Sequence, residues 1–379
     1  MVTLGIDRIH EYGSMLVGKK IGLITNYSGV DSDLTDDMTV FYKAGYPITK
    51  VFTPEHGLYG AMDGAKVGDG VHPQYGVPMI SLYGAKLKPS PEDLQGLDLL
   101  IYDIQDVGLR YYTYIYTLAN CMQAADKVGL PFVILDRPNP LGNVISGNRT
   151  DPKYDCFVGA HRLATRYGLT VGELGYYFMQ FFKLTLDYQV IPMKGYQASM
   201  KWPQTGQLWN LPSPSIHTFH SALCYVGGCF FEATNISEGR GTFAPFQVYG
   251  APFVDMDQLV KVLHEKIHDP NLTFRTRAFT PFWSKYEGKT CFGVEFIPLS
   301  DNLNFMPTAL IMMKTMMELY PNDFEFRSYA DVSRLTSLSG DQSVDDYLQG
   351  NRMLEDLLDD WQTQSDAFAK EVKGCRIYG

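Results

Sequence analysis

The stretch Leu97-Asp-Leu-Leu-Ile-Tyr-Asp-Ile-Gln-Asp106 decides the fold class, because a short apolar run is followed at once by polar residues. A run with both faces apolar suits a strand of a parallel sheet that is covered on both sides. Similar runs recur at intervals long enough for crossover helices, over residues 20–27, 48–52 and 132–136. The pattern therefore predicts alternating strands and helices.

Two segments between these runs have the apolar spacing of helices, residues 33–43 and 112–127. After Pro252 the pattern changes, with helices expected at 256–268, 307–319 and 351–372 and short strands near 273–279 and 289–297. We predict a Rossmann-like α/β domain with a mostly parallel sheet over residues 1–248 and a smaller α+β domain over residues 249–379. The active-site cleft is expected at their interface. A chain of 379 residues is long enough for two domains.

Composition excludes several classes of partner. The net charge of −10 disfavours binding to nucleic acid. The sequence has no apolar stretch of about 18 residues, so no membrane span is expected. The first residues do not have the pattern of a signal peptide, which fits a cytoplasmic protein that starts at Met1 or an exported one whose signal is not part of this sequence.

Cofactor motifs are missing or out of context. There is no G-x-G-x-x-G between a strand and a helix, no phosphate-binding loop and no G-x-S-x-G elbow, so NAD, nucleotide and serine-hydrolase chemistry are disfavoured. His264-Glu-Lys-Ile-His268 matches the zinc motif H-E-x-x-H, but Asp269-Pro270 ends that helix at once. We expect no metal and no cofactor, which leaves carboxylate chemistry.

Chemically active side chains follow the predicted strands. The carboxyl ends of parallel strands meet at one edge of a sheet, where open α/β sheets bind ligands. Residues 228–233 are interpreted as a further strand that leads into a glycine-rich loop, residues 235–242. The candidate binding residues at this edge are Asn26, His56, Gln105, Arg110, Tyr112, Arg137, Asn139, Asn235 and Arg240.

Glu55 is the principal catalytic candidate. In Thr53-Pro-Glu-His-Gly57 the proline fixes the backbone after a strand and the glycine permits a sharp turn, so the carboxyl is held in place. A held carboxyl in a partly dry cleft suits the acid of a glycoside hydrolase. The alternative is that Glu55 caps the following loop or pairs with an arginine.

A second carboxylate is expected from Asp106 or Glu238. Asp106 also suits the N-cap of the next helix, which is the commoner role at such a position. Glu238 belongs to the glycine-rich loop, where the backbone can approach a ligand closely. Arg137 is placed to bind a ligand carboxylate with two nitrogens of its guanidinium group, or to form a structural salt bridge with Asp136 or Asp106. His217 and His220 are interpreted as structural.

Together these segments resemble a family of exo-acting β-N-acetylmuramidases of peptidoglycan recycling, formerly catalogued as a domain of unknown function. The resemblance runs nearly end to end. It rests on Gly22-Leu-Ile-Thr-Asn26, Pro54-Glu-His-Gly57, Ser81-Leu-Tyr-Gly84, Asp103-Ile-Gln-Asp-Val-Gly108, Asp136-Arg-Pro-Asn-Pro140, Thr170-Val-Gly-Glu-Leu174, Thr234-Asn-Ile-Ser-Glu-Gly-Arg-Gly-Thr242 and Gly250-Ala-Pro252.

The resemblance implies hydrolytic release of N-acetylmuramic acid from the non-reducing end of peptidoglycan fragments, by a periplasmic or otherwise exported protein. It implies Glu55 as catalytic residue, with the substrate's acetamido group as a possible replacement for the second carboxylate. A cation, Arg110, Arg137 or Arg240, is expected to bind the lactyl carboxylate. The rival interpretation is a non-catalytic glycan-binding protein. Three positions depart from the family pattern and affect the expected sugar subsites, namely Tyr167 for a histidine, Ala233 for a glycine and Ser215-Ile216 for Pro-Asn.

Overall fold

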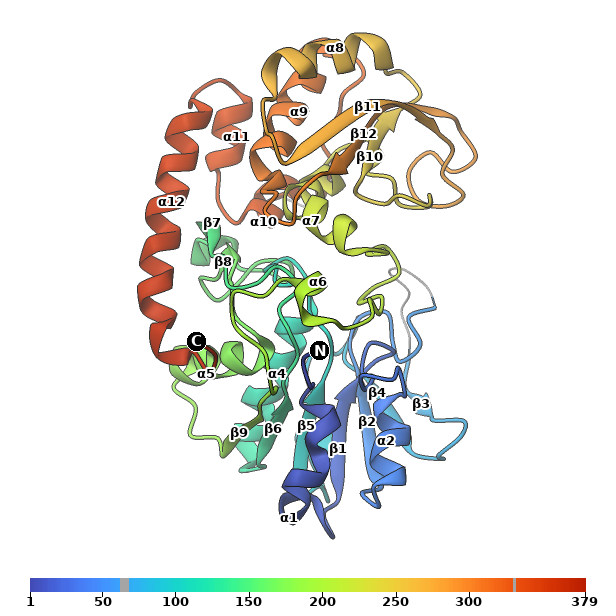
Figure 1. Ribbon diagram of the computed structural model, residues 1–379, viewed down its shortest axis with the longest axis vertical. Coiled ribbons are helices and arrows are strands. Elements are labelled where there is room, and N and C mark those ends of the chain that lie inside the picture. Colours follow the sequence, from blue (N-terminus) through green and yellow to red (C-terminus); the bar gives the residue numbers. More distant parts are fainter. Residues whose placement is uncertain (62–67, 330–331) are drawn as a thin grey trace.

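The computed structural model describes residues 1–61, 68–329 and 332–379 and has two parts (Figure 1). The larger part is built on a seven-stranded sheet in which β3 is antiparallel to β4 and the other neighbouring pairs are parallel. In spatial order its strands are β3 (Gly70–Val71), β4 (Pro78–Ser81), β2 (Ile48–Thr53), β1 (Ile21–Thr25), β5 (Leu99–Asp103), β6 (Phe132–Leu135) and β9 (Tyr188–Ile191). The predicted Rossmann-like fold is confirmed.

The order in which successive strands are added to the sheet changes direction between β1 and β5. From β1 it builds outward through β2 to β4, then returns to β5 and builds the other way through β6 to β9. In doubly wound sheets the ligand site lies at the carboxyl ends of the strands near this reversal. The smaller part covers that region in Figure 1.

Helices cover both faces of the main sheet. Leu100 and Tyr102 of β5 pack in one cluster with side chains of α4 and α5, whereas Leu99 and Ile101 pack in a second cluster with η1, α1 and α2. This alternation explains why the strand is apolar throughout. The helices of this part are η1 (Ile6–Tyr12), α1 (Gly13–Leu16), α2 (Asp37–Lys43), α3 (Pro91–Leu94), α4 (Tyr114–Val128), η2 (Pro152–Tyr154), α5 (Val171–Phe182) and α6 (Trp202–Thr205).

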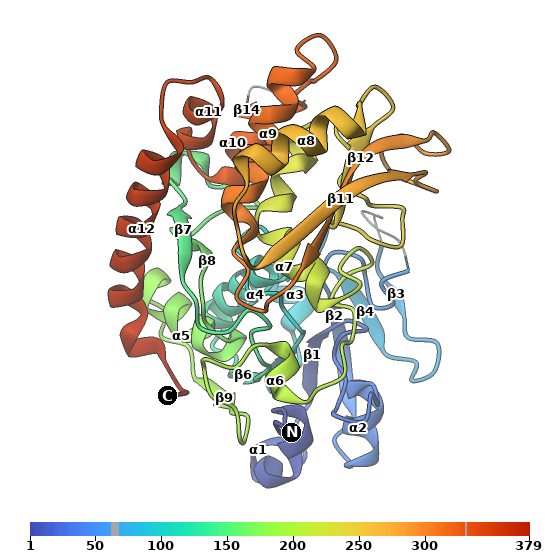
Figure 2. The same ribbon diagram turned by 45° about the horizontal axis from the view of Figure 1, so that its top comes forward.

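The smaller part contains a three-stranded antiparallel sheet in the order β10-β12-β11 (Figure 2). These strands are β10 (Val248–Ala251), β11 (Leu272–Phe279) and β12 (Cys291–Pro298). The helices around them include α7 (Phe219–Gly228), η3 (Cys229–Ala233), α8 (Met256–Lys266), α9 (Phe305–Leu319), α10 (Arg334–Ser339) and α11 (Ser343–Leu348), and β13 (Ser328–Tyr329) pairs with β14 (Val332–Ser333). Helix α7 packs against α9. The α+β character of this part is confirmed, while the division at residue 248 stays a prediction.

One sequence interpretation is wrong. Residues 228–233 were expected to form a strand, but they form the end of α7 and the 3-10 helix η3. The apolar residues of the run are explained by their burial, since Phe230, Phe231 and Ala233 are fully buried. A short apolar run does not distinguish a buried strand from a buried helix.

The last long helix, α12 (Leu354–Glu371), returns from the smaller part to the larger one (Figure 1). It packs against β7 (Ser146–Arg149), which pairs with β8 (Ala164–Arg166), and is followed by η4 (Val372–Cys375) beside α5. The C-terminal residues thus lie against the main sheet's own helices. Within the described residues, no helix has the length and apolarity needed to cross a membrane.

Candidate active site

A pocket of about 100 Å³ lies between the two parts and contains Glu55. We call it the Glu55 pocket. Its walls come from both parts of the chain, so neither part forms it alone. It is lined by Glu55, His56, Tyr111, Tyr112, Thr113, Val158, Ser213, Ser215, Ile216, Tyr225, Glu232, Arg240, Phe246 and Arg334.

Glu55 is held by the turn that follows β2. His56 and Gly57 both have positive φ, 69° and 67°, and the Gly57 amide donates to the carbonyl of Pro54. Positive φ at a non-glycine residue such as His56 is uncommon and marks a constrained turn. The half-buried carboxylate of Glu55 accepts a hydrogen bond of 2.6 Å from Thr113 Oγ1. The predicted positioning of Glu55 is therefore explained by its local contacts.

Thr113 occupies the N-cap position of α4, yet its side chain does not cap the helix. Its hydroxyl reaches across to Glu55 instead. The start of α4 thus serves as a support for the carboxylate that follows β2. This hydrogen bond joins two loops that were predicted to meet at the same edge of the sheet.

Glu232, Arg240 and Arg334 form the ionic wall of the pocket. Arg240 Nη2 lies 3.1 Å from Glu232 Oε1, and Arg334 Nη2 lies 3.5 Å from Glu232 Oε2. These side chains are only 17–23% exposed, so their charges are screened less than surface charges. Arg240 was predicted from the sequence, whereas Glu232 and Arg334 were not.

Glu238 lies behind this wall. It is 1% exposed and forms ion pairs of 2.7 Å with Arg240 and 2.8 Å with Lys285. Although burial opposes ionisation, the two cations lower the pKa of Glu238 to about 2. Glu238 is absent from the pocket lining and fixes Arg240 in position.

Aromatic rings form the other walls. The ring centroids of Tyr111 and Tyr225 are 5.3 Å apart in an edge-to-face arrangement, and those of Tyr225 and Phe246 are 4.6 Å apart. The Arg240 guanidinium lies over Phe246, 5.9 Å from its centroid. These contacts come from α7 and the glycine-rich loop on one side and the start of α4 on the other. The pocket therefore combines flat apolar faces with charged groups, as sugar sites do.

Asp106 lies in a buried cluster outside the pocket lining. Its Oδ2 accepts hydrogen bonds from the Gly108 amide, at 2.6 Å, and from the hydroxyl of Tyr167. Burial raises the pKa of Asp106 to about 6. Tyr167, which replaces the histidine of the family pattern, is thus the side chain that contacts Asp106. The expected capping role does not apply, because Thr113 is the N-cap residue of α4.

Three predicted binding residues hold the loops of the sheet edge rather than line the pocket. Asn26 accepts from both the amide and the hydroxyl of Ser28, and Gln105 donates to the carbonyls of Asp106 and Pro138. Asn139 donates to the carbonyl of Leu169 and accepts from the Leu141 amide. Each of the three is buried.

Arg110 and Arg137 are buried in the interior. Arg137 binds Asp103 with two nitrogens, at 2.5 and 2.8 Å, and is 3% exposed. Arg110 is completely buried and donates to the carbonyls of Asn148 and Ser339. Neither lines the Glu55 pocket. Of the three arginines expected to bind a substrate carboxylate, the structure places Arg240 there.

Asn235 and His264 were singled out from the sequence, but they make local contacts elsewhere and do not line the Glu55 pocket. Asn235 donates to the carbonyl of Asp323 and accepts from the Glu325 amide, so it joins two loops of the smaller part. The ring of His264 stacks on Phe274 at 4.3 Å, and α8 ends at Lys266, before His268. The two histidines of the H-E-x-x-H match therefore do not lie on one helix.

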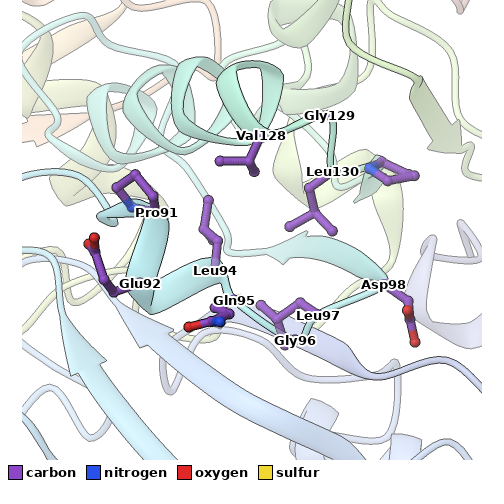
Figure 3. A pocket seen from close by; sticks show the side chains of 11 residues that line it. Pro91, Glu92, Leu94, Gln95, Gly96, Leu97, Asp98, Val128, Gly129 and Leu130 are labelled. Carbon is purple, nitrogen blue, oxygen red and sulfur yellow. The ribbon is translucent and has the colours of Figure 1, made fainter.

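A larger hollow of about 590 Å³ lies beside α3 (Figure 3). Leu97 and Asp98 precede β5, and Leu130 and Pro131 precede β6, so this hollow is at the amino ends of those strands. Ligands of open parallel sheets bind at the opposite edge. Position in the fold therefore favours the smaller Glu55 pocket as the site of chemistry.

Comparison with known proteins shows the family to which the chain is similar. Residues 21–220 match the family model described as exo-beta-N-acetylmuramidase NamZ, N-terminal, and residues 223–378 match its C-terminal counterpart. The chain is 40% identical to the peptidoglycan beta-N-acetylmuramidase NamZ of Bacillus subtilis strain 168, over 100% of this chain and 91% of that protein.

Solved structures show the same architecture. Two DUF1343 family proteins from Bacteroides fragilis NCTC 9343 align over 100% of this chain and 99% of theirs. Their TM-scores are 0.89 and 0.77, at 32% and 27% sequence identity. The alignments extend over both parts of the chain, so the walls of the Glu55 pocket lie within the shared fold.

Proposed function

Because the chain belongs to the exo-β-N-acetylmuramidase NamZ family, we propose that this glycosidase releases terminal N-acetylmuramic acid from the non-reducing end of peptidoglycan fragments. Glu55 is the catalytic acid in this proposal. The observation that carries it is the Thr113-supported Glu55 carboxyl in a pocket that also presents Arg240 and Arg334.

The position of Glu55 suits proton donation. Glycoside hydrolysis requires a carboxylic acid that protonates the leaving oxygen, together with a second group that assists departure or attacks the sugar. Glu55 is half-buried at the carboxyl end of β2, and its turn restricts the directions that the carboxyl can take. A proton donor with a fixed direction contributes more than a mobile one.

The charge of the ionic wall suits an acidic sugar. Arg240 and Arg334 both line the Glu55 pocket and place two guanidinium groups in its wall. N-acetylmuramic acid carries a lactyl carboxylate, which arginine binds well. We assign that role to Arg240 and Arg334.

The second catalytic group is best assigned to Glu232 or to the substrate's own acetamido group. Glu232 lines the same pocket as Glu55, whereas Glu238 and Asp106 do not. Glu232 also forms ion pairs with Arg240 and Arg334, which fix the position of its carboxylate. A carboxylate with these properties can stabilise positive charge that develops on the sugar.

Product analysis tests the proposal. The substrate is a tetrasaccharide without stem peptides that has N-acetylmuramic acid at its non-reducing end and a reduced opposite end. It is incubated with the protein, and the products are identified by mass spectrometry. We expect free N-acetylmuramic acid and a trisaccharide that keeps the reduced end as first products. Release of internal disaccharides, or binding of the glycan without any cleavage, would contradict the proposal.

A further inference from the structure

A second hollow adjoins the Glu55 pocket. Its volume is about 470 Å³, and Ser215 lines both cavities. Arg240 lines the first and its neighbour Gly241 lines the second, so the two cavities lie side by side along the glycine-rich loop. We call the second cavity the aromatic hollow; it is lined by Ala61, Pro214, Ser215, His217, Gly241, Thr242, Pro245, Phe282 and Trp283.

Exposed aromatic side chains surround this hollow. Phe282 is 61% exposed and Phe243 is 95% exposed, with ring centroids 6.3 Å apart. The half-buried Trp283 lines the hollow together with Phe282. Large apolar side chains that gather at the surface beside a cleft usually mark a binding surface. Their exposure also means that packing within the protein does not account for them.

The hollow is rigidly connected to the ionic wall. The Phe282 amide donates to the carbonyl of Gly241, and a Cβ on Gly241 would lie 2.1 Å from the Trp283 carbonyl oxygen, so the backbones touch. Lys285 Nζ donates to Glu238 at 2.8 Å and to the carbonyls of Phe231 and Ile236. The loop that carries Phe282 is therefore anchored to the carboxylate that also positions Arg240.

We propose that the aromatic hollow binds the sugar on the leaving side of the scissile bond, an uncharged N-acetylhexosamine such as N-acetylglucosamine. This inference rests on the proposed function. With the terminal acidic sugar in the Glu55 pocket, the next sugar extends past Ser215 into the hollow. There its apolar face stacks on Phe282 or Trp283, and Phe243 covers its outer edge.

The lining favours a neutral sugar over a peptide. Among the lining residues in the described part of the chain, His217 carries the only ionisable side chain, and its ring nitrogen is 2.7 Å from the Pro214 carbonyl oxygen. Peptidoglycan stem peptides carry several carboxylates, which need cations or clustered donors. Flat aromatic faces without charged groups instead suit the C–H face of a pyranose ring.

The test compares two substrates that differ in the leaving group. One is the disaccharide of N-acetylmuramic acid β-1,4-linked to N-acetylglucosamine, and the other is 2,2,2-trifluoroethyl β-N-acetylmuraminide, whose leaving group has no ring. For Phe282→Ala and Phe243→Ala we expect kcat/KM on the disaccharide to fall about tenfold, as for loss of a buried aromatic contact. Activity on the trifluoroethyl substrate is expected to stay unchanged.

Two controls separate the possible failures. Phe181→Ala removes a 37% exposed phenylalanine of α5, outside the hollow's lining, and is expected to change neither activity. Disaccharide binding is also measured calorimetrically in the Glu55→Gln background, where Phe282→Ala is expected to weaken binding about tenfold. This second readout does not need turnover.

Equal losses on both substrates, or no loss on either together with unchanged binding, would overturn the assignment of the hollow. A change of oligomeric state in Phe243→Ala with unchanged kinetics would also overturn it and indicate an interface between copies. If the wild type cleaves neither substrate but Phe282→Ala weakens disaccharide binding, the proposed hydrolysis fails while the sugar subsite stands.

Discussion

Glu232 and Glu238 are six residues apart but occupy opposite sides of the same arginine. Glu232 faces the Glu55 pocket, and Glu238 is enclosed by Arg240 and Lys285. A buried ion pair of this kind adds little net stability, but it can fix the geometry of a site. At the scale of single residues, the proposed function therefore depends on how carboxylates hold the two arginines that line the pocket.

Arg334 is predicted to determine the preference for the acidic sugar. Arg334→Ala removes one cation from the pocket wall, so KM for a β-N-acetylmuraminide should rise about tenfold or more, as for loss of a charged hydrogen bond. KM for the matching β-N-acetylglucosaminide, which lacks the lactyl carboxylate, should not rise. Steady-state kinetics on both glycosides check this. Arg275→Ala, which removes a 62% exposed arginine of β11, serves as control; an equal rise of KM for both sugars would contradict the prediction.

Asp106 is predicted to make stability depend on pH. Its pKa is about 6 in the folded protein and close to 3.8 when unfolded, so the folded state binds more protons between these values and stability falls as pH rises through them. Asp106→Asn removes this loss of stability at higher pH, because an amide does not ionise. Relative to wild type, the variant should gain on the order of 2–3 kcal/mol of unfolding free energy between pH 4 and pH 7. Urea unfolding at both pH values measures this, and a constant difference between the two proteins would contradict it.

At the residue scale, sequence reasoning identified Glu55, His56, Tyr112 and Arg240 among the residues that now line the pocket. It missed Glu232 because that residue lies in the run interpreted as a strand. It missed Arg334 because about a hundred residues separate it from Arg240, and no local pattern indicates that α10 packs beside η3. Long-range packing of this kind is not encoded in the spacing of nearby residues.

The elements were predicted better than their contacts. Strands β1, β2, β5 and β6 and helices α2 and α4 follow the predicted apolar periodicity, whereas β3, β4 and β9 were not predicted. Helix α4 ends at Val128 with Gly129, at φ of 67°, as its C-cap, and the sequence indicated this stop. The error at residues 228–233 has a physical cause, since every residue of this segment except Glu232 is buried. Periodicity detects an element through the contrast between its buried and exposed faces, and that contrast is absent there.

The chain's last residues brace the helix α5. The N3 residue of its capping box, Glu173, also accepts hydrogen bonds from the Ile377 and Tyr378 amides and pairs with Arg376 at 3.3 Å. Tyr378 donates from its hydroxyl to the buried carboxylate of Asp136, at 2.7 Å. The segment after α12 thus completes the hydrogen bonding of the main sheet's loops.

Tyr378→Phe is predicted to destabilise the fold without altering chemistry. Loss of the hydroxyl removes a donor from Asp136, which should lower the unfolding free energy by about 1–3 kcal/mol. The midpoint of thermal unfolding should fall, whereas kcat at 25 °C should stay at the wild-type value. Tyr176→Phe changes a 37% exposed tyrosine of α5 and provides the matched control. An unchanged midpoint for Tyr378→Phe would show that this contact contributes no stability.

At the scale of the whole molecule, the active pocket exists only where the two parts meet. Arg110 is one of the groups that fix their relation, because its guanidinium binds Asn148 in the larger part and Ser339 at the end of α10. Helix α10 begins with Arg334, a residue of the pocket wall. A buried cation far from the substrate thus positions a cation that lines the pocket.

Arg110→Met is predicted to loosen this junction. The carbonyls of Asn148 and Ser339 lose a donor, so the unfolding free energy should fall by about 1–3 kcal/mol, as for buried acceptors left without a partner. Because α10 then shifts more freely, KM for the acidic substrate should rise more than kcat falls. Thermal unfolding and steady-state kinetics test both parts of this prediction. A loss of stability with unchanged KM would separate Arg110 from the positioning of Arg334.

The central claim is that Glu55 donates the proton to the leaving oxygen. The direct measurement is kcat of wild type and Glu55→Gln on two N-acetylmuraminides, the natural disaccharide and an activated 2,4-dinitrophenyl glycoside, with the exposed Glu265→Gln of α8 as control. The account predicts at least about a 100-fold loss on the disaccharide and a much smaller loss on the activated glycoside, whose leaving group needs no acid. Cleavage of the disaccharide by Glu55→Gln at the wild-type rate would contradict it.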